Sequence, residues 1–244
     1  NMSHELRTPL NSMLILSGLL KENKEVNLNQ KQVEYASTIN AAGKDLLHLI
    51  NDILDLSKVE AGEIELHFED VPLQEIYLPV ENLFRPLAEQ KDLSFLVEVS
   101  DAPPQLRIDL ARTQQVLKNL LSNAMKFTVK GSVSLQIHLA SETENPLSAA
   151  AVAFSIVDTG IGIHDDKQGV IFDAFKQADG GISRKYGGTG LGLSISRQLA
   201  FKMGGDLTLR SVENEGSVFT LYLPLVPPLA LSRNASESEQ KQAV

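Results

Sequence analysis

The sequence predicts an α+β protein, in which an N-terminal helical hairpin precedes a domain that mixes helices and strands. Apolar residues recur with helical spacing before residue 62, and they alternate with period two in several later segments. The length of 244 residues favours two units, and 43 % apolar residues are enough to build a core. We expect a hairpin over 1–62, a second domain over 63–226, and a polar linker or tail over 227–244.

The hairpin is predicted from two apolar stripes that flank the polar segment 21–29. A 4-3-7 spacing with Ser17 at the missing position is typical of a heptad seam. The first stripe comprises Leu6, Leu10, Met13 and Leu20, and the second comprises Ala36, Ile39, Gly43, Leu46, Ile50 and Ile53. Leu14, Leu47 and Leu54 widen these stripes beyond what one partner helix can cover. We therefore expect a homodimer whose two hairpins form a four-helix bundle, although packing on the rest of the same chain is the alternative.

The second domain is predicted from alternating segments interleaved with helical ones. We expect strands over 64–71, 95–100, 132–139, 152–158, 206–212 and 217–223. Helices are expected at about 75–90, 110–127, 164–175 and 190–203. Pro79 and Pro86 should bend or interrupt the first of these helices, because proline lacks the N–H that a helix interior needs.

Charge and composition exclude several functions. The net charge of −9 would repel a phosphate backbone, so we expect no nucleic-acid binding. The chain has no cysteine, which excludes disulfides and thiol nucleophiles. No apolar run approaches the roughly 20 residues that cross a bilayer, so this portion should make no membrane contact. Because His4 lies so close to the first residue, we expect a cytoplasmic excerpt of a longer, membrane-anchored bacterial sensor.

Two glycine-containing segments are candidates for a nucleotide site. In "SIVDTGIGI", a strand ends at Asp158, whose carboxylate can accept a hydrogen bond from an exocyclic amine, although the same pattern is ordinary turn chemistry. In "RKYGGTGLGLSIS", four glycines precede an apolar-periodic helix whose free N–H groups can bind a phosphate. A dinucleotide-binding loop would instead follow directly on a strand. The polar lead-in is better suited to a mobile flap over a nucleotide.

A third segment, "QVLKNLLSNAMKFT", can supply a metal site. Asn119, Asn123 and Lys126 share one helix face, opposite Leu117, Leu121 and Ala124. Amide oxygens suit Mg²⁺ and a lysine suits phosphate, although such residues are also common on any exposed face. The three segments together predict a site for Mg²⁺-ATP.

These motifs resemble the catalytic core of a two-component sensor histidine kinase, of the hybrid type. The matching strings are "SHELRTPL", "NLLSNAMKFT", "DTGIGI", "IFDAF" and "GGTGLGL", in the order of the family. The resemblance implies a dimerisation and histidine-phosphotransfer hairpin followed by an ATP-binding α/β sandwich of the type shared with gyrase, the Hsp90 chaperones and MutL. It also implies a response-regulator receiver domain as partner.

The resemblance further implies a role for individual residues. His4 would be the phosphoacceptor, Glu5 its acid/base partner, and Thr8 a residue for dephosphorylating the regulator. Asn119 and Asn123 would hold Mg²⁺, Lys126 would contact phosphate, and Asp158 would bind the adenine amino group. Phe172 would anchor a lid. The remaining implied cofactor contacts are Gly160, Gly162, Ile163, Phe175, Arg184, Lys185, Gly188, Thr189, Gly190, Leu191, Gly192 and Thr220.

The placement of His4 beside a proline fits phosphotransfer. His4 precedes the seam residue Leu6 by two positions, or about 200° of helix, so its ring should point away from the bundle. Pro9 leaves the carbonyl of Glu5 without its helical partner, so a local bend is expected. Adjacent residues do not face each other on a regular helix, so this bend or a water must bring Glu5 to the imidazole.

Two other functions are compatible with parts of the sequence. A chaperone-like or topoisomerase-like ATPase would use the same nucleotide fold, but it has no use for the hairpin or for His4. A dimeric scaffold that binds nucleotide without phosphoryl transfer is the second alternative.

Overall fold

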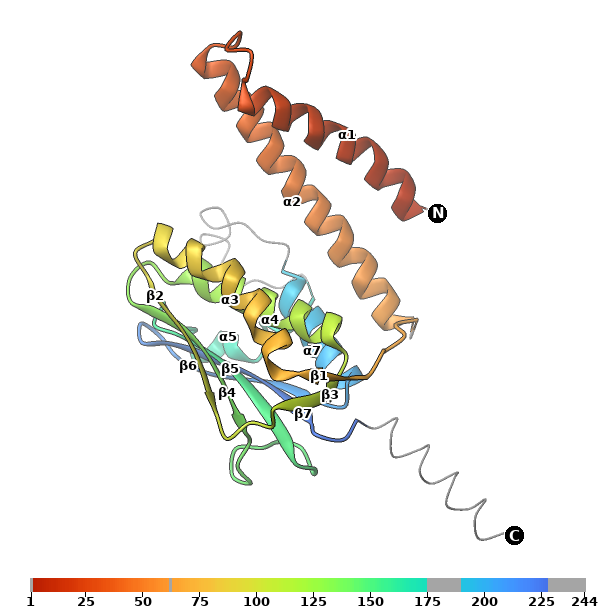
Figure 1. Cartoon of the computed structure of the whole chain (residues 1–244), viewed down its shortest axis with the longest axis vertical. Coiled ribbons are helices and arrows are strands. Elements are labelled where there is room, and N and C mark those ends of the chain that lie inside the picture. Colours follow the sequence, from red (N-terminus) through yellow and green to blue (C-terminus); the bar gives the residue numbers. More distant parts are fainter. Residues whose placement is uncertain (1, 62, 175–189, 228–244) are drawn as a thin grey trace, which may run out of the picture.

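The computed structural model describes residues 2–61, 63–174 and 190–227. A helical hairpin leads into an α/β domain (Figure 1), as the sequence predicts. The helices are α1 (Met2–Glu22), α2 (Gln30–Glu60), α3 (Leu73–Gln90), α4 (Leu110–Phe127), α5 (Asp165–Gln168) and α7 (Gly192–Lys202). The strands are β1 (Glu69–Pro72), β2 (Ser94–Ser100), β3 (Gln105–Ile108), β4 (Ser132–Leu139), β5 (Ala151–Asp158), β6 (Asp206–Val212) and β7 (Gly216–Pro224).

The domain is a sandwich of one sheet and one helix layer. Its five strands lie in the order β2-β4-β5-β7-β6, with β2 parallel to β4 and the other pairs antiparallel. Helices α3, α4 and α7 cover one face of this sheet (Figure 1). The core lies between the two layers, where alternate residues of β4 such as Val133, Leu135 and Ile137 are buried. The candidate site described below lies at the end of the sheet where the central strand β5 ends.

The predicted strand over 64–71 is wrong for most of its length. Only β1, at Glu69–Pro72, forms a ladder, and its partner is the short strand β3, which the sequence did not reveal. Residues 63–68 are extended without a partner strand, yet Ile64 and Leu66 pack against the core while Glu65 is exposed. Period-two alternation therefore reports an extended chain with one buried face, whether or not another strand pairs with it.

Asp109 holds this extended segment in place. Its carboxylate caps α4 by accepting a hydrogen bond from the N–H of Arg112 at 2.9 Å. The second carboxylate oxygen accepts a hydrogen bond from the N–H of His67, also at 2.9 Å. Asp109 is 4 % exposed, so both bonds are shielded from water. One buried side chain thus joins the segment after the hairpin to the start of α4.

The prolines do not interrupt α3, although interruption is one of the two effects predicted for them. Both Pro79 and Pro86 lie inside one continuous helix. Pro79 cannot donate to the carbonyl of Glu75, but the side-chain Nε2 of Gln114 donates to it at 3.0 Å. A neighbouring helix therefore replaces the hydrogen bond that the proline removes.

The predicted helix over 164–175 is also wrong for most of its described part, because within 164–174 only Asp165–Gln168 is α-helical. Beyond Gly169 the backbone continues in turns, in which the N–H of Ile171 donates to Lys167 and that of Asp173 donates to Val170. Ile171 is nevertheless buried, which accounts for the apolar periodicity.

Some residues of the two apolar stripes are buried between α1 and α2, and others lie on the exposed surface of the hairpin. Leu10 and Ser17 on α1 and Ala36 and Asn40 on α2 are buried between the helices. Asn40 Nδ2 donates to the Leu14 carbonyl at 2.9 Å and to Ser17 Oγ at 3.0 Å, so a polar contact sits in this interface. The predicted seam residues therefore do not all lie on the face that the partner helix covers. The seam residues that are exposed instead are Met13, Leu20, Ile39, Leu46 and Ile53.

The C-terminal part of α2 packs on the α/β domain. Leu56 is buried within the domain core, and Leu49 packs against it. Gln115 Nε2 on α4 donates to Asp55 Oδ2 at 2.7 Å. The hairpin thus contacts the helix layer that borders the candidate site. In the described part of the chain, none of the helices is long and apolar enough to span a bilayer.

Candidate active site

The polar face of α4 is the first component of the candidate site. Leu117 and Leu121 are fully buried and Ala124 is nearly so, whereas Asn119, Asn123 and Lys126 remain partly accessible. The predicted division of this helix into an apolar and a polar face is therefore confirmed. Two amide side chains and one cation lie along one side of α4, where they can meet a ligand together.

Asp158 is the second component, at the end of β5. Its side chain is 7 % exposed, and the N–H of Gly160 donates to its Oδ1 at 2.8 Å. Burial raises the pKa of Asp158, while hydrogen bonds from the backbone of Gly160 and Ser217 oppose the rise. A carboxylate held in this way keeps a defined direction and can accept a hydrogen bond from a ligand.

The turn after Asp158 packs against the end of α4. A Cβ on Gly160 would lie 2.7 Å from the carbonyl oxygen of Phe127, the last residue of α4. Only glycine permits this approach, which joins the Asp158 turn to the helix that carries Asn119 and Asn123.

The same turn is also fastened to β6. Gly162 has a φ of +62°, and a Cβ there would lie 2.0 Å from the carbonyl oxygen of Val212. The N–H of Ile163 donates to Ser211 Oγ at 2.8 Å, and the Ile163 side chain packs partly against the core. Ile161, in contrast, is 40 % exposed and available to a flat apolar ring.

The start of α7 is the third component. Leu191 is fully buried, and no side chain in the described ranges caps the helix that begins at Gly192. Gly190 has a φ of +71°, which glycine adopts readily. The first N–H groups of such a helix are suited to bind an anion.

Helix α7 also contacts α4 through Asn119. A Cβ on Gly192 would lie 2.4 Å from Asn119 Oδ1, so the absence of a side chain makes room for the amide. Asn119 Nδ2 donates to Ser196 Oγ at 2.8 Å. The sequence did not reveal Ser196, because a serine within an apolar-periodic helix carries no distinguishing signal.

Lys126 lies at the end of α4 nearest the Asp158 turn. Its Nζ is 4.8 Å from the centre of the Phe127 ring. Burial lowers the pKa of Lys126, because the charged form is partly removed from water. An anionic ligand placed here would recover part of that lost solvation energy.

Phe172 is held between the sheet and α7. Its ring meets Phe219 edge to face, with 6.4 Å between centres, and the Arg197 guanidinium lies 4.8 Å from the Phe172 ring centre. Arg197 is a second contact that the sequence did not reveal, for the same reason as Ser196. These contacts hold the segment that leads toward residue 175.

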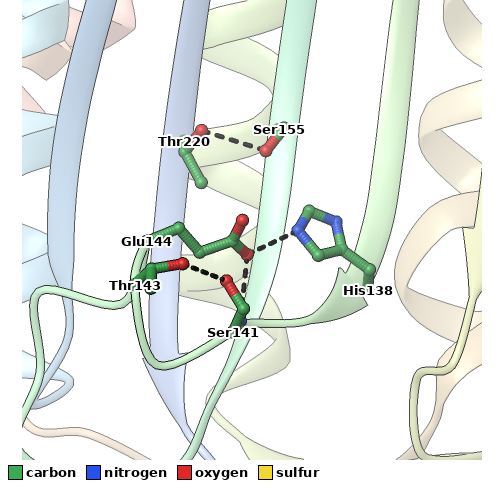
Figure 2. A network of polar contacts seen from close by, with 6 residues as sticks. All are labelled: His138, Ser141, Thr143, Glu144, Ser155 and Thr220. Atoms are coloured by element: carbon green, nitrogen blue, oxygen red, sulfur yellow. Dashed lines mark hydrogen bonds and ion pairs between the residues drawn. The ribbon is translucent and has the colours of Figure 1, made fainter.

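Thr220 does not join the other predicted site residues. It pairs with Ser155 across β5 and β7, and their hydroxyls are 2.9 Å apart. Both lie on the sheet face opposite the helix layer, because they alternate with the core residues Phe154, Phe219 and Leu221. Figure 2 shows them beside His138, whose Nε2 is 2.7 Å from Glu144 Oε1. The predicted cofactor contact of Thr220 is therefore not supported by its position.

Several predicted site residues lie outside the described residues. They are Phe175, Arg184, Lys185, Gly188 and Thr189. On the hairpin, His4, Glu5 and Thr8 all belong to α1, and Pro9 lies inside this helix without ending it. Thr8 is exposed, whereas the side chains of His4 and Glu5 are outside the description.

The chemistry of the three components fits a magnesium nucleotide. Amide oxygens on α4 are hard ligands of the kind that Mg²⁺ accepts, and Lys126 is a cation for phosphate. Asp158 lies near the Phe127 end of α4, and the start of α7 lies near Asn119. Asn119 and the last residue of α4, Phe127, are about 12 Å apart along the helix axis. A ligand with a hydrogen-bonding ring and an anionic tail can reach both ends.

Comparisons with known proteins agree with this reading. Residues 1–62 match the His Kinase A (phospho-acceptor) domain, and residues 108–227 match the histidine kinase-, DNA gyrase B-, and HSP90-like ATPase family. Sensory/regulatory protein RpfC of Xanthomonas campestris pv. campestris is 40 % identical over 92 % of this chain. The autoinducer 2 sensor kinase/phosphatase LuxQ of Vibrio cholerae is 39 % identical over 92 % of it.

The chain spans 30 % of the length of RpfC and 25 % of LuxQ. Among solved structures, full-length ShkA in complex with AMPPNP is 34 % identical with a TM-score of 0.75, over 93 % of this chain and 45 % of ShkA. The family is established by two domain matches on one chain, and by relatives whose similarity extends over both matched regions. The chain belongs to the sensor histidine kinases and carries their phospho-acceptor and ATPase domains.

Proposed function

We propose that this chain transfers the γ-phosphoryl group of Mg²⁺-ATP to His4, and from there to an aspartate of a response-regulator receiver domain. The observation that supports this most directly is the arrangement around α4. Its amide and lysine face is bordered by a buried carboxylate at one end and by the start of α7, where no described side chain forms a cap, at the other. Bound Mg²⁺ would neutralise the developing phosphate charge.

In this proposal each element of the site has one task. Asp158 accepts a hydrogen bond from the adenine amino group, and Ile161 offers an apolar surface to the ring. Asn123 and Asn119 present amide oxygens to Mg²⁺, while Lys126 binds a phosphate oxygen. Backbone N–H groups at Gly190 and Gly192, with Gly188 before them, bind the phosphates at the start of α7.

The chemistry on the hairpin follows from ordinary imidazole properties. A neutral imidazole has a nitrogen lone pair, so the His4 ring can act as a nucleophile near neutral pH. Glu5 fixes its tautomer and accepts its proton. Thr8 belongs to the same helix one turn later and is exposed, so its hydroxyl can orient a water that attacks the phosphorylated regulator. The name of LuxQ includes both kinase and phosphatase, which agrees with a bifunctional enzyme.

The hairpin supports a homodimer. The exposed apolar residues of α1 and α2 include Met13, Leu20, Ile39 and Leu46, which the internal packing of the hairpin leaves uncovered. A second hairpin would bury them in a four-helix bundle. The longer relatives are consistent with a parent protein of the hybrid type, in which a sensor and a membrane anchor lie outside this chain.

The test is incubation with γ-labelled ATP and Mg²⁺. We expect acid-labile, alkali-stable label on the wild type and none on His4→Gln or Asn123→Ala. His4→Gln should still bind AMPPNP, because the nucleotide site lies in the other domain. Hydrolysis without a phosphoprotein would favour a chaperone-like or topoisomerase-like ATPase. Binding without either reaction would favour a scaffold, and both outcomes would overturn the proposal.

A further inference from the structure

The Asn119 amide is held by helix α7 at two points. Its Nδ2 donates to Ser196 Oγ at 2.8 Å, and its Oδ1 lies over the space left by the missing side chain of Gly192. These residues belong to the first two turns of α7, whereas Asn119 belongs to α4. The contact therefore spans the junction between the two helices that border the candidate site.

The direction of this hydrogen bond determines which amide atom faces the ligand. A carboxamide has a donor nitrogen and an acceptor oxygen on opposite sides, and only the oxygen can serve a cation. Because Nδ2 is engaged by Ser196, the oxygen is turned toward the start of α7. A Cβ on Gly192 would lie 2.4 Å from Oδ1 but 3.1 Å from Nδ2. The oxygen thus lies beside Gly192, the first residue of α7.

Ser196 is suited to fix this orientation. It is 2 % exposed, so water does not compete for its hydroxyl. Without the hydroxyl, Nδ2 would lose its partner and the amide could rotate.

We propose that Ser196 is a positioning residue that orients Asn119, so that the amide oxygen is available to Mg²⁺-nucleotide. The proposal rests on the function proposed above, in which Asn119 and Asn123 serve the metal. Ser196 itself does not touch the ligand. It acts through Asn119, in the way that groups behind a metal ligand set the ligand's direction.

A neighbouring serine provides a matched control. Ser194 lies on the same helix and is 4 % exposed, but its Oγ donates to the carbonyl of Leu191 at 2.8 Å, within the start of its own helix. Ser194→Ala therefore removes the same atom from an equally buried place on α7, without a contact to Asn119.

The experiment measures AMPPNP binding to the full chain by calorimetry, in Mg²⁺ and again in EDTA. The ratio of the two dissociation constants isolates the contribution of Mg²⁺ from that of the nucleotide alone. We expect Ser196→Ala to reduce this ratio about 10-fold, the lower end of the loss seen when a group supporting a metal ligand is removed. Binding in EDTA and the ratio for Ser194→Ala should stay at the wild-type value.

Two further variants test how Ser196 acts. Ser196→Thr restores the hydroxyl and should recover the wild-type ratio. Ser196→Cys keeps the volume but weakens the hydrogen bond, and it serves if the alanine variant does not fold. In an Asn119→Ala background, Ser196→Ala should cause no further loss, because its effect passes through that amide.

A Mg²⁺ contribution that is unchanged in both Ser196→Ala and Ser196→Cys would overturn the inference. So would an equal loss in the Asn119→Ala background, since it would show a route independent of that residue. Failure of the proposed function looks different, because wild-type protein would then bind AMPPNP equally in Mg²⁺ and in EDTA, or would not bind it.

Discussion

Asp109 accepts two hydrogen bonds through one side chain, and substitutions at this position should distinguish the energetic contribution of each bond. Its carboxylate caps α4 through Arg112 and holds the segment after the hairpin through His67. Loss of an N-cap costs about 1 kcal/mol. Loss of the bond to His67 costs about 1 to 2 kcal/mol, because the acceptor is a buried carboxylate but the exposed His67 can be rehydrated.

A substitution series distinguishes these contributions. Asp109→Ala should lose both and lower the free energy of unfolding by about 2 to 3 kcal/mol. Asp109→Ser keeps a capping oxygen but is too short to reach His67, so it should lose about 1 to 2 kcal/mol. Asp109→Asn keeps the cap and places an amide donor opposite the His67 N–H, so it should resemble the serine variant.

Urea unfolding followed by circular dichroism measures these free energies of unfolding. Amide hydrogen exchange shows which of the two hydrogen bonds each variant has lost. The His67 amide should lose protection in all three variants. The Arg112 amide should lose protection only in Asp109→Ala. Equal stability of the serine and alanine variants would refute the capping argument. Unchanged His67 protection in the serine variant would refute the second hydrogen bond.

Asp158, Lys126 and Glu144 are the charged residues on which the remaining predictions rest. Asp158→Asn should weaken AMPPNP binding at least about 10-fold, since one hydrogen bond to a charged group is lost. Its stability relative to wild type should improve as the pH rises above 3.8, because burial raises the pKa of Asp158 and so penalises the ionised form; urea unfolding at several pH values checks this. AMPPNP affinity should fall as the pH rises toward 10.5, because burial lowers the pKa of Lys126 and the side chain then loses its charge below that pH. Lys126→Arg should remove this pH dependence. A wild-type affinity that does not change with pH would contradict the role of Lys126. Burial favours a higher pKa for Glu144, but hydrogen bonds from His138 and Ser141, together with the electrostatic interaction with His138, outweigh burial and lower the pKa. The ionised Glu144 carboxylate therefore stabilises the fold above pH 4.5 and does so less as the pH falls below it. Glu144→Gln should cost about 0.5 kcal/mol at pH 7 and less at pH 3, and equal costs at both pH values would contradict a stabilising role of the ionised carboxylate.

Local patterns predicted most elements of the α/β domain. The strands β4 to β7 and helix α4 follow from a period of two or of 3.6 within one segment, and the structure places them within a residue of the prediction. The same signal failed over 64–71, where an extended segment buries one face against the core without forming a ladder. It succeeded for α3, but the expected interruption of that helix did not occur, because Gln114 replaces the hydrogen bond lost at Pro79 and the sequence does not show this contact.

Much of the candidate site could also be predicted from the amino-acid sequence. The amide and lysine face of α4 and the Asp158 turn are local features, and glycines mark the start of α7. Thr220 shows the limit of this reasoning, because the strand register places it on the far face of the sheet.

The amino-acid order by itself determined which residues share a helix face, where strands end, and which domain families the chain belongs to. These properties depend on neighbours within a few positions, so a short segment suffices to read them. Only the tertiary structure decided which stripe of the hairpin is covered, and that Ser196 meets Asn119 across 77 positions. Such contacts depend on how separate helices pack, and packing is a property of many segments at once.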